Sequence, residues 1–520
     1  MWAPVFSSAL LLLASGARAS NQFHLSLVGD ADYMLDWVTP AGQESSVLLY
    51  GRSATRMDNQ VEAKAAGDVE QSAGAQVTCW SALLHGLEPG STVYYALKGN
   101  SSQPKSFSVP KSTITWAVFG DLAAPMMKQA AAVSLPALKK ELQAGVYQGV
   151  INLGDIGYEL VKENGENYME ELQDIGSKVP IQTTIGNHEH EHAMAPEFAL
   201  QNYRRRFAGI TLGAGAVSGS NSNEFFSFSS GLIHFVFLDT EIYGNEAYFS
   251  LQADGTWKPD EKARRDMAKL QAAWLEYDLS RVDRAKTPYV VVCTHRPPFK
   301  TPDGLSVAGN KFVEEIVPLM SQYEVDLYFS GHEHTYMVFE ESTVSSHRIP
   351  PIIISGSPGN NEFIRQKEEI KMKGFTEKTV IPKYGYGYLT ATEKELQWKW
   401  GSAATDGSKT PKPKDWELDD EITIPRRQIA SATEKKGTPV KPPQLVEALW
   451  TKSSGGSGAQ SGSTDEEVSG TVAPADDSKS TLTQKETSSS PTPASSGSWV
   501  LGSEAALISP AVALVVSFFV

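Results

Sequence analysis

The chain has 520 residues, a length for which two or more domains are expected. Its formal net charge is −15, and its Lys and Arg residues form no long cluster, which disfavours nucleic-acid binding. Cys79 and Cys293 are the only cysteines, which excludes a disulfide framework and a zinc-finger spacing.

The first residues have the features of a targeting segment. Residues 1–19 contain the apolar run Ala9–Ala14 and end in Ala17-Arg18-Ala19, a small-residue cleavage pattern. They predict a secretory signal peptide, although no basic side chain precedes the apolar run.

Residues 20–110 predict a β-rich module. Short apolar runs separated by Gly, Pro, Asp and Asn are typical of strands joined by turns. The expected strands are His24–Val28, Tyr33–Val38, Ser46–Tyr50, Gln76–Leu83 and Ser91–Lys98. They indicate a β-sandwich of the fibronectin or immunoglobulin kind without a catalytic motif. The N-glycosylation sequon at Asn100 falls in an expected surface loop.

Residues 111–425 alternate strand-like runs with helical ones, which indicates α/β layers. Met126–Ala144 and Glu261–Arg281 are predicted amphipathic helices. Tyr388–Trp400 predicts a late hairpin that turns near Lys394.

Five polar blocks in this region each follow a strand-like run. The runs are Thr115–Phe119, Gly149–Leu153, the weaker Ile181–Ile185, Tyr289–Val292 and Val325–Phe329. The blocks are Gly120-Asp121-Leu122, Gly154-Asp155-Ile156-Gly157-Tyr158, Gly186-Asn187-His188-Glu189, Val292-Cys293-Thr294-His295 and Gly331-His332-Glu333-His334. Because the carboxyl ends of parallel strands converge on one crevice, these donors are expected to meet there. Two Asp, one Tyr, one Asn and three His are enough to hold two metal ions.

Each of these residues also has a simpler interpretation. Asp121 and Asp155 could cap the helices that follow their strands, and Asn187 could be a turn residue. Tyr158 taken alone is more often a core residue than a ligand. His332 and His334 would share one face of an extended segment, whereas a tight turn, which Gly331 permits, would aim them separately.

The order and spelling of the blocks resemble the metallophosphoesterase superfamily, and most closely the purple acid phosphatases. That family's pattern runs Asp-x-Gly, Gly-Asp-x-x-Tyr, Gly-Asn-His-Asp/Glu, Val-x-x-His and Gly-His-x-His. The resemblance covers roughly residues 22–425. It implies a fibronectin-like β-sandwich followed by a catalytic αββα sandwich of two mixed sheets with helices outside, within an α+β or α/β fold class.

The resemblance also implies a dinuclear centre of Fe(III) and a divalent ion, which is Fe, Zn or Mn. Family positions matching Asp121, Asp155, Tyr158 and His334 hold Fe(III), and those matching Asp155, Asn187, His295 and His332 hold the divalent ion. A tyrosinate from Tyr158 at acidic pH itself favours a strong Lewis acid such as Fe(III). The implied activity is acid phosphatase hydrolysis of phosphate monoesters by a metal-bound hydroxide.

Other residues are expected to serve the substrate. The family places Asn187, His188 and His295 against the phosphate, and it makes His188 and the bridging Asp155 catalytic. Glu189 is expected to orient His188 or a neighbouring backbone amide, whereas His190 and His192 are expected to be solvated. His234 is expected to be structural.

Three departures from the family pattern matter. Ala123 replaces a glycine, which is tolerable where the backbone does not need positive φ. Tyr336-Met337-Val338 stands where the family often has Tyr-Glu-Arg. No histidine lies between His295 and His332, so the leaving-group proton donor stays open between His188, His190, His192 and a metal-bound water.

The last residues suggest a stalk and an anchor. Residues 426–498 are rich in Ser, Thr, Gly and Pro and predict a disordered stalk. Residues 499–520 end in the apolar run Ala505–Val520, after the small residues Ala494–Gly497. This pattern predicts a glycosylphosphatidylinositol (GPI) attachment signal that is removed, in preference to a membrane span of ~20 residues.

The sequence thus predicts a phosphatase of the secretory pathway, held at the cell surface by a lipid anchor. Its expected partners are a phosphorylated small molecule or phosphoprotein and the membrane, without nucleic acid. The alternatives are a phosphodiesterase or nucleotide pyrophosphatase on the same site, and a surface-binding protein that kept the scaffold.

Overall fold

The computed structural model describes residues 21–428, except 101–102, 128–129, 191–199, 245–247, 255, 300–308, 361–363 and 365–374. The predicted signal peptide, most of the stalk, the anchor signal and His192 lie outside the described residues. Among the described residues, no helix has both the length and the apolar character needed to cross a membrane.

The N-terminal module consists of two four-stranded antiparallel sheets. One sheet has the order β1 (His24–Gly29), β2 (Asp32–Pro40), β6 (Gln76–Leu84), β5 (Lys64–Glu70). The other has the order β4 (Asn59–Glu62), β3 (Val47–Gly51), β7 (Thr92–Leu97), β8 (Lys105–Ser108). Buried residues of both sheets, among them Leu25, Trp37 and Tyr95, share one core, so the predicted sandwich is observed.

Three strands of the module, β4, β5 and β8, were not predicted from the sequence. Residues 59–70 are largely polar and half-exposed, so these two strands show no clear alternation of apolar and polar residues. They form because their backbone N–H and C=O groups pair with those of neighbouring strands, β4 with β3 and β5 with β6. β8 buries only Phe107 of its four residues.

The region after the sandwich, residues 111–425, contains two mixed sheets, as expected. The six-stranded sheet has the order β11 (Ile181–Thr183), β10 (Gly149–Asn152), β9 (Trp116–Phe119), β23 (Gly385–Ala391), β24 (Glu395–Ala404), β25 (Pro413–Pro425). The seven-stranded sheet has the order β12 (Phe226–Ser230), β13 (Ile233–Phe237), β16 (Tyr289–Cys293), β17 (Leu327–Ser330), β21 (Ile352–Ser355), β18 (Tyr336–Phe339), β22 (Glu377–Ile381).

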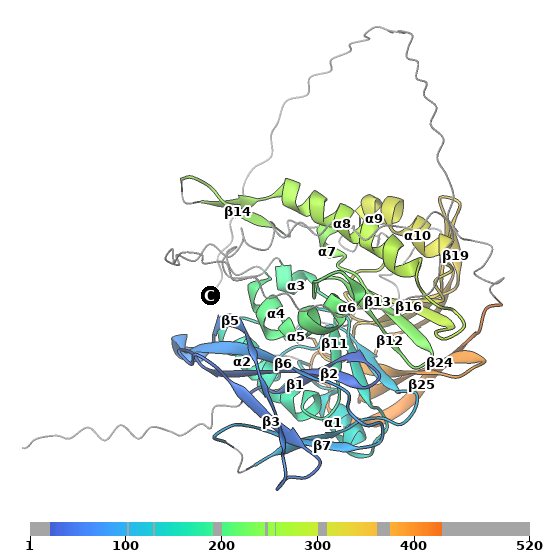
Figure 1. Ribbon diagram of the computed structural model, residues 1–520. Helices are drawn as coiled ribbons and strands as arrows, with labels where there is room; N and C mark the ends of the chain where they lie inside the picture. The colour runs from blue at the N-terminus through green and yellow to red at the C-terminus, as the bar shows by residue number, and fades with distance from the viewer. Residues whose placement is uncertain are drawn as a thin grey trace, which may run out of the picture. The chain divides into compact units, whose positions relative to one another are not determined.

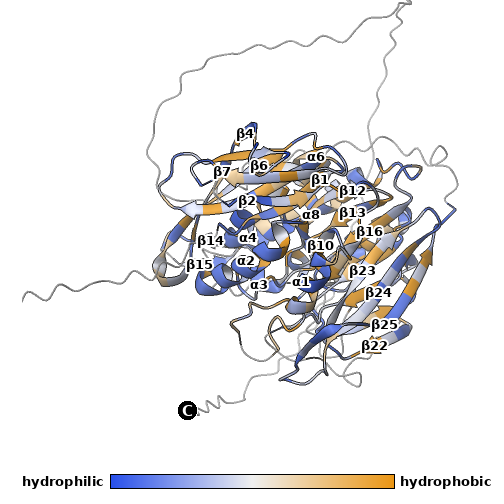
Figure 2. Cartoon of the chain, turned by 90° about the horizontal axis from the view of Figure 1, so that it is seen from below, coloured by the Kyte–Doolittle hydropathy of each residue, from blue (hydrophilic) through white to orange (hydrophobic). Residues whose placement is uncertain are grey.

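Side-chain alternation along β16 shows how the layers stack. Val291 and Cys293 belong to the core that the seven-stranded sheet shares with Trp398 of the six-stranded sheet. Val290 and Val292 point the other way, into a second core with Trp274 of α8 (Glu261–Leu279). Cys293 is therefore a packing residue, and burial raises the pKa of its thiol. The central strands β13 and β16 are orange in Figure 2, whereas α2 is largely blue.

Helices cover the outer faces of the two sheets (Figure 1). Helices α8, α9 (Gly309–Glu315) and α10 (Val317–Gln322) lie on one side, and α1 (Leu135–Gln143) and α2 (Lys162–Gly176) lie on the other. The shorter elements are α3 (Asn187–His190), α4 (Gln201–Arg206), α5 (Ala208–Ile210), η3 (Thr211–Gly215), α6 (Ala216–Ser218), α7 (Glu241–Gly244), η1 (Ser72–Gly74), β14 (Phe249–Leu251), β15 (Trp257–Pro259), β19 (Ser342–Val344) and β20 (His347–Ile349).

One of the two predicted helices is confirmed, and the other is confirmed only in its C-terminal half. α8 begins after Asp260, whose side chain accepts the backbone N–H of Ala263, and it ends two residues before the predicted end. The predicted helix Met126–Ala144 begins only at Leu135. Before it, the backbone N–H groups of Ala132 and Ser134 donate to the carbonyls of Gly359 and Pro358, and those of Val133 and Leu135 form short turns, so this segment combines turns with contacts to a distant loop. The late hairpin is confirmed as β23 and β24.

Contacts join the β-sandwich to the catalytic region. Tyr95 Oη donates to the carbonyl of Ser177 at the end of α2. The backbone N–H of Gly209 donates to Asp36, and His24 Nε2 lies 2.8 Å from the carbonyl oxygen of Arg206. The sandwich is thus anchored by buried polar contacts as well as by packing.

Candidate metal centre

The candidate ligands follow the carboxyl ends of strands in both sheets. Asp121 and Asp155 follow β9 and β10, whereas His295 and His332 follow β16 and β17. Asp121, Asp155, Tyr158 and His332 have φ values of 63°, 52°, 51° and 66°, a left-handed conformation that is unfavourable for residues other than glycine. Such conformations persist only where the surrounding structure enforces them, and they cluster at functional sites.

Glycines of the sequence blocks make room for these side chains. A methyl group at Gly186 would collide with the carboxylate and backbone nitrogen of Asp155. A methyl group at Gly331 would collide with Asp121 Oδ2. By contrast, Ala123 does not have positive φ, so its methyl group is accommodated, as expected.

Three of the candidate ligands form one cluster. Tyr158 Oη lies 2.7 Å from His334 Nε2, and His334 Nε2 lies 3.4 Å from Asp121 Oδ1. All three residues are buried. Asp121 Oδ1 receives no hydrogen bond from any residue that the structure describes. Because a buried carboxylate oxygen that accepts no hydrogen bond is costly, this cluster suits a cation.

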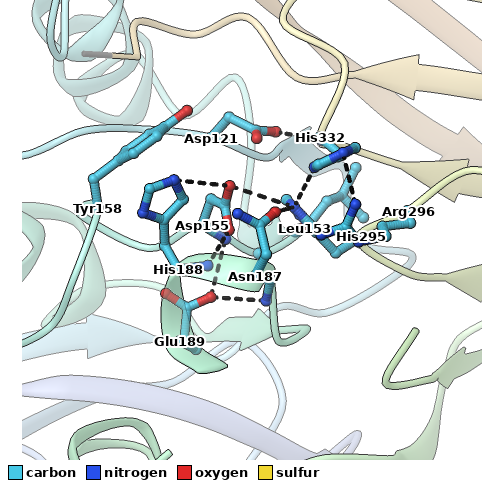
Figure 3. A network of polar contacts seen from close by, with 12 residues as sticks. Asp121, Leu153, Asp155, Tyr158, Asn187, His188, Glu189, His295, Arg296 and His332 are labelled. Carbon is cyan, nitrogen blue, oxygen red and sulfur yellow. Dashed lines mark hydrogen bonds and ion pairs between the residues drawn. The ribbon is translucent and has the colours of Figure 1, made fainter. Parts of the chain in front are cut away.

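The other four candidates form a second cluster beside the first (Figure 3). His295 Nε2 is its centre, at 3.1 Å from Asn187 Oδ1, 3.2 Å from His332 Nδ1 and 3.4 Å from Asp155 Oδ2. One ligand atom each of Asp155, His295 and His332 lies within 4.8 Å of the others, a spacing that could hold a metal ion. His295 Nδ1 donates to the carbonyl of Leu153, which directs the lone pair of a neutral ring to Nε2.

The titratable groups of the second cluster have pKa values that are shifted in different directions. Burial disfavours a charged His295, but the Asp155 carboxylate outweighs burial and raises the pKa of His295 to about 10. Burial would raise the pKa of Asp155, but His295 and His188 hold this pKa well below the usual range. Burial and the Arg296 charge lower the pKa of His332 well below its ordinary value. A neutral His332 keeps a lone pair for a cation.

Two simpler interpretations of the ligands are not supported. The helices after β9 and β10 have Ser134 and Val161 at their N-caps, so neither aspartate caps the helix after its own strand. His332 and His334 do not share one extended face, because the left-handed His332 makes the tight turn that Gly331 permits. The two histidines therefore reach different clusters.

Glu189 organises the loops around the centre. Its carboxylate accepts the backbone N–H groups of Gly186, Asp155 and Ile156, at 2.7, 3.0 and 2.9 Å. Asp155 Oδ1 in turn accepts the backbone N–H of His188 at 3.0 Å. Glu189 thus serves backbone amides, one of its two expected roles, and ties the second block to the third.

His188 lies at the edge of the centre. Its ring is packed against Tyr158, with ring centroids 4.4 Å apart, and its Nε2 lies 3.9 Å from Asp155 Oδ2. Among the described side chains of the predicted site, His188 and His332 are only partly buried, whereas the others are buried. His188 is therefore placed to meet a molecule that approaches the centre from solvent.

The prediction for His190 is wrong. His190 was expected to be solvated, but it is buried, and its Nε2 lies 3.1 Å from Asp239 Oδ2. The expectation for His234 is confirmed, since its Nε2 lies 2.8 Å from the buried Asp278. Asn100 is exposed, as a glycosylation site requires, but its sequon partner at 102 lies outside the described residues.

A buried ion pair that was not predicted from the sequence lies beside the centre. Arg296 Nε donates to both oxygens of Glu241 at 2.8 and 2.9 Å, and its Nη1 lies 3.0 Å from His332 Nε2. Arg296 directly follows the ligand candidate His295, which is the one sequence signal that could have pointed to it. Glu241 ends the polar run Asp239-Thr240-Glu241 after β13, a signal of the same kind as the five blocks that was not used.

Comparisons with known proteins agree with the blocks and the fold. Residues 115–336 match the family described as calcineurin-like phosphoesterase, and residues 20–115 match the purple acid phosphatase N-terminal domain. Acid phosphatase type 7 of Mus musculus is 28% identical over 386 residues, 66% of this chain and 79% of that protein. Purple acid phosphatase 22 of Arabidopsis thaliana is 27% identical over 396 residues, 73% of this chain and 81% of that protein.

A solved structure supports the fold independently. The purple acid phosphatase PPD1 from yellow lupin (Lupinus luteus) seeds aligns with a TM-score of 0.55 over 79% of this chain and 75% of that chain. At 16% sequence identity this likeness shows the fold alone. The relatives and the two family matches confirm the resemblance drawn from the five blocks. The chain belongs to the purple acid phosphatase family of calcineurin-like phosphoesterases.

Proposed function

We propose that the chain hydrolyses phosphate monoesters at a dinuclear metal centre. The observation that carries this proposal is the convergence of seven donors, from five separate segments, into two adjacent clusters with Asp155 in the second. The donor chemistry fits two ions, since carboxylate, imidazole and phenol groups suit iron, zinc and manganese. Asp121 Oδ1, which accepts no hydrogen bond from the described residues, supports the same conclusion.

The two clusters differ in the ion that they suit. Asp121, Asp155, Tyr158 and His334 would hold Fe(III), since a phenolate is a hard donor that a trivalent ion can keep ionised at acidic pH. Asp155, Asn187, His295 and His332 would hold a divalent ion, which is Fe, Zn or Mn. In this proposal Asp155 serves both ions. When bound, the two ions neutralise phosphoryl charge and make a nucleophile from water.

The protein's own groups orient the substrate. His188, partly exposed and packed on Tyr158, would donate a hydrogen bond to a phosphate oxygen or a proton to the leaving group. Asn187 and His295 would border the same phosphate. His190 is a poor candidate for the leaving-group donor, because its ring is buried against Asp239. Below neutral pH imidazole side chains gain a proton, so activity is expected to be highest in acid.

The cellular setting belongs to the same proposal. We infer a secreted protein with a removed signal peptide at 1–19, a β-sandwich at 20–110, a catalytic domain at 111–425, a stalk at 426–498 and an anchor signal at 499–520. The sequence patterns at the two ends support this organisation. Glycosylation at Asn100 is supported by its exposure. Phosphatidylinositol-specific phospholipase C should then release the protein from intact cells, and detection of Ala505–Val520 in the mature chain would favour a membrane span.

The activity is tested by comparing a phosphate monoester with its matched diester on metal-analysed protein. Faster turnover of the monoester supports the proposal. Faster turnover of the diester would favour a phosphodiesterase on the same site. Full metal content without turnover of either would favour a surface-binding protein.

A further inference from the structure

Arg296 is a buried cation held rigidly beside the candidate metal centre. Its Nε donates to both oxygens of the buried Glu241, and its backbone N–H donates to Thr240 Oγ1 at 3.0 Å. Its carbonyl accepts the hydroxyl of Tyr328 at 2.9 Å. Because the backbone and the guanidinium are both fixed, the remaining guanidinium nitrogens have little freedom to move.

Nη1 of Arg296 reaches the centre itself, at 3.0 Å from His332 Nε2. His332 turns its other nitrogen, Nδ1, toward His295 Nε2 and the second cluster. A metal ion in that cluster would need the lone pair of His332 at Nδ1, which places the ring proton on Nε2. The contact between Arg296 and His332 would then consist of two donors side by side.

Two neighbouring donors favour an anionic oxygen as their common acceptor. The place is open to a ligand, since His332 is partly exposed, as is His188. Figure 3 shows His188 on one side of Asp155 and Asn187, and His332 with Arg296 on the other. Short contacts join the two sides, since Asp155 Oδ2 lies 3.9 Å from His188 Nε2 and 3.4 Å from His295 Nε2, and His295 Nε2 lies 3.2 Å from His332 Nδ1. A phosphate group bound across these residues would face His188 at one end and Arg296 at the other.

We propose that Arg296 is a substrate-binding residue, whose guanidinium and the Nε2–H of His332 together hold one oxygen of the phosphate group. This inference rests on the proposed function. Arg296, which directly follows the candidate metal ligand His295, would supply the cationic contact to the phosphate. No histidine lies between His295 and His332. Glu241 keeps the guanidinium in place and leaves the pair electrically balanced without a substrate.

The experiment measures the affinity of metal-loaded protein for inorganic phosphate, together with metal content. Arg296→Met is combined with Glu241→Gln, because Arg296→Met alone would leave a buried carboxylate without its partner. Arg296→Lys keeps the charge and loses the forked geometry. Arg281→Met, at an exposed position after α8, is the matched control for the loss of one arginine. Calorimetry gives the Kd for phosphate, and KM for a monoester is measured in parallel.

The double variant is expected to keep its metals and to bind phosphate with a Kd about 10- to 100-fold higher than that of wild type. This is the change expected when one charge-assisted hydrogen bond is lost. Arg296→Lys should raise it less, and Arg281→Met should not change it. KM should rise with the Kd. If the double variant does not fold, the Arg296→Lys result decides alone.

Two results would overturn the inference. An unchanged Kd with full metal content would mean that Arg296 only balances Glu241. Loss of metal, with normal phosphate affinity in the fraction that stays loaded, would mean that Arg296 only positions His332. Wild-type protein that holds no metal would instead refute the proposed function, and the inference with it.

Discussion

Tyr158 Oη lies 2.7 Å from His334 Nε2, although the two residues are 176 positions apart in the chain. Tyr158 has a left-handed backbone in the loop after β10, and His334 follows the tight turn after β17. Two loops from different sheets thus deliver a phenol and an imidazole to one point, with Asp121 beside them.

This geometry predicts a coloured protein. Tyr158 bound to Fe(III) would give a tyrosinate-to-iron charge-transfer band and a violet colour. Tyr158→Phe should lose the band while circular dichroism shows an intact fold. The measurement is the visible spectrum of both proteins with iron analysis. A colourless wild type that contains zinc or manganese in both positions would refute the iron assignment and leave the hydrolase assignment standing.

His188 is predicted to act on the substrate rather than on the metals. His188→Ala should keep both ions and lower monoester turnover about 10²- to 10⁴-fold, the usual range for a general acid–base group. His347→Ala is the histidine control, because His347 lies in β20 and is not one of the predicted site residues. This variant should keep full activity. The comparison is a pH–rate profile with metal analysis of each protein. Full turnover of His188→Ala across the acid range would show that this role is wrong.

Gly186 is predicted to be indispensable for metal binding. In Gly186→Ala the added methyl group would collide with the Asp155 carboxylate and backbone, so Asp155 must move. Gly29→Ala in β1 is the matched control, because a methyl group there meets no atom within 4 Å and φ is not positive. Gly186→Ala should lose metal and activity, and Gly29→Ala should keep both. Normal metal content in Gly186→Ala would contradict the close approach of these two loops.

The buried pair of Asp36 and His24 predicts a compensated pH dependence of stability. Burial raises the pKa of Asp36 to about 7, against the hydrogen bonds from Ser81 and Gly209. Burial lowers the pKa of His24 to about 4. The raised pKa of Asp36 stabilises the fold at low pH, and this contribution is lost as pH rises from about 4 to 7. The lowered pKa of His24 destabilises the fold as pH falls from about 6.5 to 4. The two residues therefore change the free energy of unfolding with pH in opposite directions.

Asp36→Asn removes the contribution of Asp36 to this pH dependence of stability. Relative to wild type, the free energy of unfolding of Asp36→Asn should fall as pH is lowered from about 7 to 4, by at most about 1.4 kcal/mol per pH unit. His24→Gln should show the opposite relative slope between about pH 6.5 and 4. Denaturant unfolding at several pH values checks both variants. Parallel pH curves for wild type and Asp36→Asn would mean that Asp36 is not protonated in the folded protein.

The candidate ligands could be predicted from sequence because their signals are local. Each lies just after an apolar strand, and parallel strands bring their carboxyl ends to one edge. Arg296 and Glu241 could not be paired from sequence, because they are 55 positions apart and Glu241 belongs to no block. The burial of His190 depends on Asp239, 49 positions away. Neighbouring residues in the sequence give no sign of such partners.

Secondary structure shows the same limit. α8 has its own cap and an apolar face with Met267, Trp274 and Leu275, so its pattern is sufficient to predict it. The segment before Leu135 is also rich in helix-forming residues, but the backbone N–H groups of Ser134 and Ala132 donate to the carbonyls of Pro358 and Gly359. Tertiary pairing therefore overrides a helical pattern there.

Metal analysis of wild type and Asp155→Ala, combined with monoester turnover, tests the dinuclear centre most directly. Asp155 Oδ2 lies 3.4 Å from His295 Nε2, and Asp155 is proposed to bind both ions. Its removal therefore takes away a negatively charged ligand that the two ions share. Wild type should contain two ions per chain, one of them iron, and should hydrolyse the monoester in acid. Asp155→Ala should lose metal and nearly all turnover. An Asp155→Ala protein that keeps both ions and its activity would contradict the dinuclear assignment.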